Sequence, residues 1–120
     1  ARVEGCVAWL TDPVILRALR KVHADLVVTS DKMHTKKRFQ GLASVRRVGR
    51  QRGRLRPLLH HKFLIGLSKS AAPLWVLTGS MNFSTHSAHN LENAVLIRDP
   101  AVVETFRAEF RRVRKISRSF

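Results

Sequence analysis

"LLHHKFLIGL", residues 58 to 67, places two histidines and a lysine inside a run of leucine, isoleucine and phenylalanine. The apolar run predicts a buried strand over 57–67. Burying an unpaired charge costs several kcal/mol, so His60 and Lys62 need partners elsewhere in the fold. The search for those partners leads to the fold class and to a candidate site.

Apolar runs on both sides of this stretch predict an α/β domain. Strands are expected over residues 3–10, 24–31, 74–83 and 90–98. Asp12 and Pro13 are typical of a helix start and predict a helix over 11–22. Asp99 and Pro100 predict a second helix that ends the chain. A length of 120 residues suits a single domain, 1–120, with helices covering the faces of the sheet.

The charge of the chain predicts a polyanionic partner. The sequence has 23 Lys and Arg against 8 Asp and Glu, a formal net charge of +15. Such an excess attracts phosphate backbones, so a nucleic acid, DNA or RNA, is the expected partner. An anionic membrane lipid is the alternative partner, which the absence of an exposed apolar amphipathic segment makes weaker.

A basic segment over 32–57 carries ten Lys or Arg, three Gly and no acidic residue. Like charges at this density predict a surface loop or hairpin inserted into the domain. Its candidate substrate-binding residues are Lys36, Lys37, Arg38, Arg46, Arg47, Arg50 and Arg52. A solvated insertion without a ligand is the alternative. Phe39 is expected either to stack on a base or to anchor the segment.

Polar residues two positions apart interrupt three of the predicted apolar strands. The pairs are His60 with Lys62, Ser80 with Asn82, and Asn90 with Glu92. Residues two apart on a strand share a face, so neighbouring strands would gather these six groups into one patch. Gly79, beside Ser80, leaves room for a ligand to approach the backbone. Asn90 and Gly79 are therefore candidate substrate contacts.

The gathered groups have the chemistry of a phosphate site. The candidate donors to nonbridging phosphate oxygens are Lys62, Ser80 and Asn82. A neutral His60 can attack phosphorus if an acceptor holds its other ring nitrogen. Glu92 is the only acidic residue in 32–98 and is the predicted acceptor.

Three segments resemble elements of a known family. "HHK" (60–62), "TGSMNFS" (78–84) and "NLEN" (90–93) are similar to the HxK, GSxN and NxE elements of the phospholipase D superfamily, particularly its small single-motif nucleases. "AWLTDPVILRAL" (8–19) resembles the segment that precedes the motif there. The resemblance implies a mixed β-sheet flanked by helices.

The resemblance also implies a mechanism. In that family two histidines, one from each of two motifs, act as nucleophile and as general acid, and no metal or cofactor is needed. This chain has a single motif, so a homodimer is expected, with His60 of both copies facing across the two-fold axis.

The chain departs from the family pattern in two places. The full motif has an aspartate five residues after the lysine, where this chain has Leu67. Strand alternation predicts that Leu67 points away from His60, so the missing aspartate is expected to be structural. Tyrosyl-DNA phosphodiesterases of the same superfamily lack it and are active. The small nucleases also have a strand and a helix ahead of the segment that matches 3–10, which this fold is expected to lack.

Other chemically reactive residues have simpler expected roles. His61 is predicted to face away from His60 and to be held in the sheet. His86 and His89 lack the cysteine partners and the spacing of a zinc site, so no metal is expected. Cys6, Trp9 and Trp75 lie in apolar runs and are expected to be core residues.

These observations predict a phosphodiesterase, specifically a nuclease, that cleaves nucleic acid through a phosphohistidine on His60. The alternatives are an inactive nucleic-acid-binding module, which Leu67 would permit, and a phospholipase acting on anionic lipid. No stretch has the pattern of a secretory signal, which leaves the compartment open and favours the cytoplasm.

Overall fold

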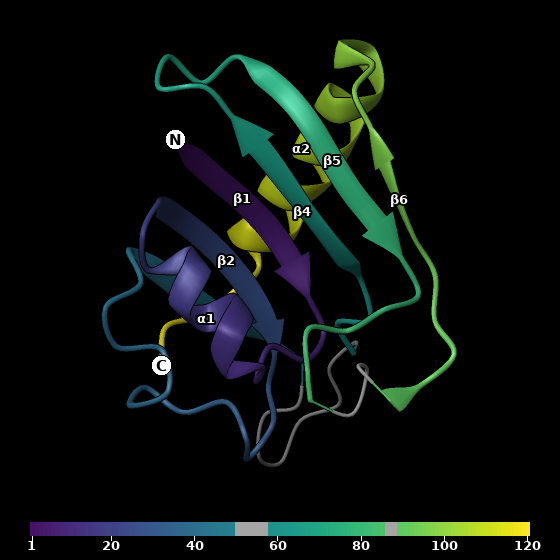
Figure 1. Ribbon diagram of the computed structural model, residues 1–120. Coiled ribbons are helices and arrows are strands. Elements are labelled where there is room, and N and C mark those ends of the chain that lie inside the picture. Colours follow the sequence, from purple (N-terminus) through teal and green to yellow (C-terminus); the bar gives the residue numbers. More distant parts are fainter. Residues whose placement is uncertain (50–57, 86–88) are drawn as a thin grey trace.

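The computed structural model describes residues 1–49, 58–85 and 89–120 and is built on one six-stranded sheet (Figure 1). The strand order is β3-β2-β1-β4-β5-β6. The strands are β1 (Arg2–Val7), β2 (His23–Thr29), β3 (Ser44–Val48), β4 (Lys62–Leu67), β5 (Pro73–Gly79) and β6 (Ala94–Ile97). The helices are α1 (Pro13–Leu19) and α2 (Pro100–Lys115).

The sheet is mixed, which confirms the predicted fold class. β2 pairs in parallel with β1 and with β3, whereas β4 is antiparallel to β1 and to β5, and β6 is antiparallel to β5. These directions bring the ends of β1, β2, β3 and β5 to the same edge of the sheet as the starts of β4 and β6. This edge, called here the site edge, lies at the lower end of the sheet in Figure 1.

Helix α1 is shorter than the 11–22 expected, but its start was predicted. The Asp12 carboxylate accepts hydrogen bonds from the backbone N–H groups of Val14 (2.8 Å) and Ile15 (3.4 Å), and Pro13 occupies the first turn. Leu16 and Leu19 are the buried residues of this helix. They pack with Val3, Val7, Leu26, Val28 and Leu64 on one face of the sheet.

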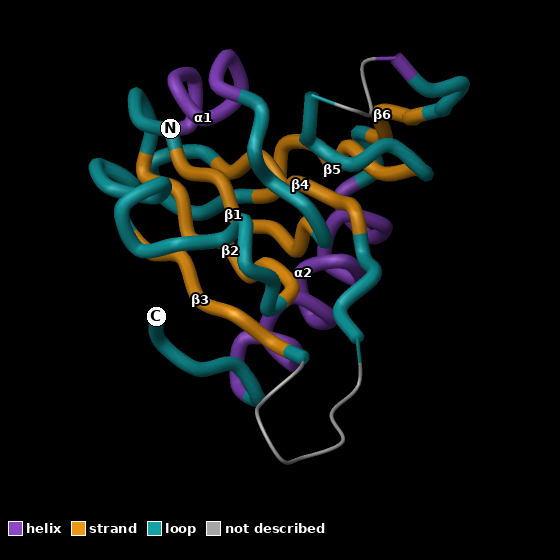
Figure 2. Tube along the Cα trace, turned by 90° about the horizontal axis from the view of Figure 1, so that it is seen from below, coloured by secondary structure: helices purple, strands orange, loops and turns teal. Residues whose placement is uncertain are grey.

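Helix α2 covers the opposite face, as Figure 2 shows. Asp99 caps its start, and its buried side chains are Val103, Phe110 and Val113. These pack with Cys6, Val27, Phe63, Ile65 and Leu67. The guanidinium of Arg107 also donates to the buried Glu4 carboxylate on β1 at 2.8 Å, which fixes the helix across the centre of the sheet.

The basic segment is not a loop throughout, so that prediction is wrong for Ser44–Val48. These residues form edge strand β3, paired in parallel with β2, and Val48 is buried. Phe39 is also buried and contacts the rings of His34 and Phe120, so it anchors the segment. Charged residues fit this strand because their partners come from residues 117–120, far away in the sequence.

The remaining composition-based expectations concern Cys6 and membrane insertion. Cys6 is buried as predicted, and burial raises the pKa of its thiol to about 12. Within the described residues, neither helix has the length and apolarity needed to cross a bilayer.

Candidate phosphate-binding site

The predicted site residues lie at the site edge, most of them just outside the strands, whereas Lys62 and Gly79 are terminal strand residues. His60 precedes β4, Ser80 and Asn82 follow β5, and Glu92 precedes β6. The predicted strands over 57–67, 74–83 and 90–98 were therefore too long at this edge. Loops that leave a rigid sheet on one side can still converge, because adjacent strands hold their ends close together.

His60 and Lys62 are in direct contact. Lys62 Nζ donates to the backbone carbonyl of His60 at 2.8 Å and lies 3.2 Å from Nδ1 and 3.3 Å from Nε2 of the ring. Partial burial lowers the pKa of Lys62, and the negative charge of Glu92 opposes that shift. The ammonium is therefore next to the imidazole and within the electrostatic reach of Glu92.

Ser80 and Glu92 form the second contact of the site. Ser80 Oγ lies 2.5 Å from Glu92 Oε2 and 2.9 Å from Asn93 Oδ1, and it accepts a hydrogen bond from the Asn93 N–H at 3.1 Å. The hydroxyl thus connects the end of β5 to the residues before β6. Among the described contacts, Glu92 has no hydrogen bond to His60, so its predicted role as the group that orients His60 stays a prediction.

Asn82 reaches the site through Trp9, which follows β1. Asn82 Oδ1 accepts a hydrogen bond from the Trp9 N–H at 3.2 Å, and the Trp9 ring meets the His60 ring edge-on with centroids 6.4 Å apart. Trp9 is half-buried, so its assignment to the core was wrong. Trp75 does pack against the core on the α1 face. Trp9 instead connects the imidazole to the Asn82 loop.

Gly79 has a different role from the one expected. A Cβ at this position would overlap the carbonyl oxygen of Asn93. The missing side chain therefore makes room for the backbone segment that precedes β6. That close approach supports the hydrogen bond from Ser80 N–H to Asn93 O at 3.0 Å. Asn90 is exposed, and its role as a substrate contact stays a prediction.

The residues predicted to point away from the site do so. His61 Nε2 meets Glu109 Oε1 on α2 at 2.9 Å, across the sheet from α1. Leu67 is 1% exposed, lies in the α2-side core and occupies the far end of β4 from Lys62. A carboxylate in place of Leu67 would therefore have no part in chemistry at the site edge.

The basic residues divide into free and bound groups. Lys36 and Lys37 are exposed and have no partner among the described residues. Arg38 donates to the Met33 carbonyl at 2.8 Å. Arg46 donates to Ser117, and Arg47 donates to the Ser119 carbonyl and lies over the Phe120 ring. Arg50 and Arg52 lie outside the described residues, and substrate binding by this set stays a prediction.

Sequence reasoning missed His34, which is 4% exposed beneath the site edge. Its Nε2 accepts the Leu10 N–H at 3.0 Å, which leaves Nδ1–H to donate to the Thr29 carbonyl at 2.7 Å. Burial lowers the pKa of this imidazole. His34 therefore joins the chain after β1 to the end of β2, and no local pattern in a strongly basic segment signals this role.

Asn93 was also missed, although it lies within the quoted segment 90–93. Its backbone and side chain both contact Ser80, as described above.

No metal-binding cluster is found in the part of the chain that the structure describes. These residues contain no group of three or more His, Cys, Asp or Glu side chains that could hold an ion. His89 is exposed, and His86 lies outside the described residues.

Comparisons with known proteins add to this geometry. The family model described as "Cardiolipin synthase, PLD-like domain" matches residues 3–114. Uncharacterized protein L381 of Acanthamoeba polyphaga mimivirus is 42% identical over 64 residues, which are 53% of this chain and 23% of that protein. The chain therefore spans under a quarter of this relative.

Two solved structures share the fold. NucT from Helicobacter pylori superposes with a TM-score of 0.78 at 15% sequence identity. The superposition covers 99% of this chain and 82% of the NucT chain. Nuc from Salmonella typhimurium, described as a phospholipase D family member, gives a TM-score of 0.73 at 20% identity and covers 100% and 82%. At these identities the likeness concerns the backbone arrangement.

Proposed function

Because the chain belongs to the phospholipase D-like domain family, we propose that it is a phosphodiesterase that cleaves nucleic acid with His60 as the nucleophile. The observation that carries the proposal is the contact of His60 with Lys62 beside the Ser80 and Glu92 pair. A nucleophile and an adjacent phosphate-binding cation are what phosphoryl transfer requires.

Substrate binding would rearrange the His60 and Lys62 contact. The ammonium has only donors, and in the free protein it lies against the His60 ring, 3.2 Å from one nitrogen and 3.3 Å from the other. A nonbridging phosphate oxygen is a better partner for the ammonium and would draw Lys62 away from the ring. A ring nitrogen of His60 then attacks phosphorus, a P–N bond forms, and the P–O bond to the leaving strand breaks.

The proton balance of this step calls for a second acid. The leaving oxygen needs a proton, and water must later cleave the P–N bond and lose a proton to a base. One imidazole bonded to phosphorus serves neither purpose. We propose that His60 of a second copy does so, in a homodimer with a shared site.

Exposed apolar residues near the site support such an interface. Leu91, adjacent to Glu92, is fully exposed, while Val95 and Leu96 on β6 are 51% and 49% exposed. Large apolar side chains exposed beside Glu92 and on the edge strand are available for contact with a second copy. A second copy docked there would bring the two site edges together.

The remaining site residues would hold the phosphate and the nucleophile. Asn82 would donate to a phosphate oxygen through its amide N–H groups, since its described contact uses Oδ1, and Ser80 would donate once substrate displaces its contact with Glu92. Trp9 limits the rotation of the His60 ring through its edge-on contact. The charge of +15 favours a nucleic acid as the source of the phosphodiester, since binding releases counterions from a phosphate backbone.

A cleavage assay with matched histidine variants tests the proposal. Labelled single- and double-stranded DNA and RNA are incubated with the protein in EDTA. Cleavage should occur and should be lost in His60→Asn, whose oligonucleotide affinity should stay within about threefold of the parent. His61→Asn is the matched control, because His61 contacts α2 on the opposite face, and it should cleave normally.

The other outcomes assign other functions. Binding of oligonucleotides without cleavage at any pH would support an inactive binding module. Release of a phosphorylated headgroup or diacyl product from cardiolipin-containing liposomes, with nucleic acids intact, would support a lipid substrate. A protein that is active and remains monomeric at every concentration tested would contradict the shared site.

A further inference from the structure

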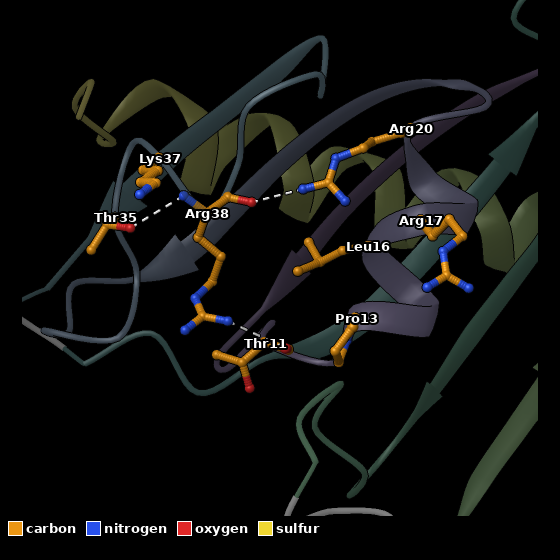
Figure 3. Close-up of a pocket in the computed structure, with 8 residues that line it drawn as sticks. All are labelled: Thr11, Pro13, Leu16, Arg17, Arg20, Thr35, Lys37 and Arg38. Atoms are coloured by element: carbon orange, nitrogen blue, oxygen red, sulfur yellow. Dashed lines mark hydrogen bonds between the residues drawn. The ribbon is translucent and has the colours of Figure 1, made fainter.

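A hollow separate from the site residues lies between α1 and the segment that follows β2 (Figure 3). It has a volume of about 480 Å³. Arg17 and Arg20 line it from the α1 side, and Lys37 and Arg38 line it from the opposite side. Its lining among the described residues includes no carboxylate.

The four cations of this hollow, called here the α1 groove, are not neutralised. Arg20 donates to the backbone carbonyls of Gln40 (2.8 Å) and Arg38 (2.9 Å), and Arg38 donates to those of Met33 and Thr11. Carbonyl partners fix the two guanidinium groups and leave their charge uncompensated. Arg17 and Lys37 are exposed and have no partner among the described residues, and neither forms a dashed contact in Figure 3.

Two carboxylates close in sequence to the groove residues accept hydrogen bonds from backbone N–H groups. Asp12 caps α1 through the N–H groups of Val14 and Ile15, and Asp31 accepts the Met33 N–H at 2.9 Å. Four like charges around one hollow repel one another, and that repulsion is relieved by a bound anion. Two of the guanidinium groups are already held in place, so less side-chain entropy is lost on binding.

The segment that follows β1 contributes to both the α1 groove and the site edge. Thr11, which lines the groove, donates through its N–H to the Phe83 carbonyl at 2.9 Å, and Phe83 follows Asn82 directly. Trp9 contacts the ring of His60. Trp9 and Thr11 are two positions apart, so the Cα atoms of Trp9 and Thr11 are at most about 7 Å apart. A phosphate chain bound at His60 would therefore reach the groove by following residues 9–11.

We propose that the α1 groove binds the phosphate backbone of a single nucleic-acid strand that flanks the bond being cleaved. This inference rests on the proposed function and extends it, since it names the path of the substrate and adds Arg17 to the binding residues. The groove is open and has the hydroxyls of Thr11 and Thr35 beside its cations, which suits a polymer that passes along it.

The test measures binding separately from cleavage. A fluorescein-labelled 20-nucleotide oligothymidylate is titrated into His60→Asn protein, with and without Arg17→Gln and Lys37→Gln together. These side chains have no described partner, so the fold is expected to be retained. The Kd should rise about fivefold to tenfold, and the slope of log K against log salt should become shallower by about 1.4 for two lost contacts.

The matched control removes the same number of positive charges, two, at the opposite edge of the sheet. Arg2→Gln with Lys69→Gln alters one exposed residue at the start of β1 and one just after β4, both at the far edge of the sheet, and should leave Kd unchanged. An equal loss in both double variants, or no loss in the groove variant, would overturn the proposal. The first result would mean that only net charge matters.

Two further measurements separate the groove from the proposed function. If wild-type protein cleaves the oligomer and bis(p-nitrophenyl) phosphate, the ratio of their kcat/KM values should fall about tenfold in the groove variant. If it cleaves neither, the function fails while the binding data still decide the groove. Loss of binding to vesicles of phosphatidylcholine with one-fifth cardiolipin, with oligomer binding intact, would assign the groove to lipid and overturn the proposal.

Discussion

The Lys62 ammonium donates to the carbonyl of His60 and lies within 3.3 Å of both nitrogens of its ring. One residue therefore fixes the backbone before β4 and also contacts the ring of the proposed nucleophile. Lys62 is also the first residue of β4, and it is paired with Val7 of β1 in the sheet. The position of the cation is thus set by the central strands of the sheet.

Replacing Lys62 by glutamine should reduce kcat on an oligonucleotide by about 10²- to 10³-fold, because the charge that stabilises the transition state is lost. Single-turnover rates at saturating substrate measure this directly. Lys69→Gln, at the far edge of the sheet, is the charge-matched control and should retain the parental rate. A Lys62 variant with an unchanged rate would show that another group binds the phosphate.

Removing the charge of Glu92 should shift the alkaline limb of the pH–rate profile to lower pH. Burial lowers the pKa of Lys62 from its ordinary 10.5 and Glu92 opposes this, so Glu92→Gln should lower it further. Lys62 would then lose its proton earlier as pH rises. Ser80→Ala removes the hydrogen bond to Glu92 but keeps the carboxylate, so its alkaline limb should coincide with that of the parent.

His34 should make the fold acid-sensitive. Burial lowers its pKa below 6.5, so the unfolded chain binds the proton more readily than the folded chain. The free energy of unfolding should be at its full value above about pH 6.5 and should decrease as pH falls, because protonated Nε2 cannot accept the Leu10 N–H.

Urea titrations of His34→Asn between pH 5 and 8 test this dependence. The variant should be about 1 to 3 kcal/mol less stable at pH 8, and its stability should vary less with pH than that of the parent. His23→Asn is the control, since His23 is exposed at the start of β2. Equal pH slopes for His34→Asn and the parent would show that His34 is not the source of the acid sensitivity.

Introducing the motif aspartate should destabilise this chain. Leu67 is 1% exposed among apolar residues under α2, where a carboxylate would be desolvated. Leu67→Asp should cost about 3 to 5 kcal/mol of unfolding free energy, whereas Leu67→Met should cost less than about 1.5 kcal/mol. An Asp variant of parental stability would indicate a basic partner for this position.

Leu91 should contribute to the proposed homodimer. Leu91→Glu puts a charge on the fully exposed apolar side chain beside Glu92 and should raise the dimer dissociation constant at least about tenfold. Sedimentation equilibrium and the dependence of specific activity on protein concentration measure this. Leu74→Glu, at a leucine that is 48% exposed near the far end of β5, should leave both unchanged.

The centres of most elements and the convergence of several site residues at one edge could be predicted from the sequence. Both helix starts follow from an aspartate before a proline, and the expected grouping of polar residues is seen in the contacts of His60 with Lys62 and of Ser80 with Glu92. The strand limits at the site edge could not be predicted. The residues there are held by contacts between loops, and alternation along one strand says nothing about such contacts.

Strand β3 was missed for a related reason. Arg46 and Arg47 make the local pattern resemble a solvated loop, and their partners Ser117 and Ser119 are about 70 positions away. Trp9 was misplaced because its apolar neighbours suggest a strand, whereas β1 ends at Val7. In each case a long-range contact overrides the local signal.

Strand β6 gives the two sides of the site unequal rigidity. It is an edge strand of four residues with little burial, paired with β5 at only four positions. The imidazole and ammonium lie beside a strand paired on both sides, whereas Glu92 is tethered to this short ribbon. Amide exchange should therefore release the carboxylate side first, and a ligand that bridges both sides would slow exchange chiefly at residues 93–97.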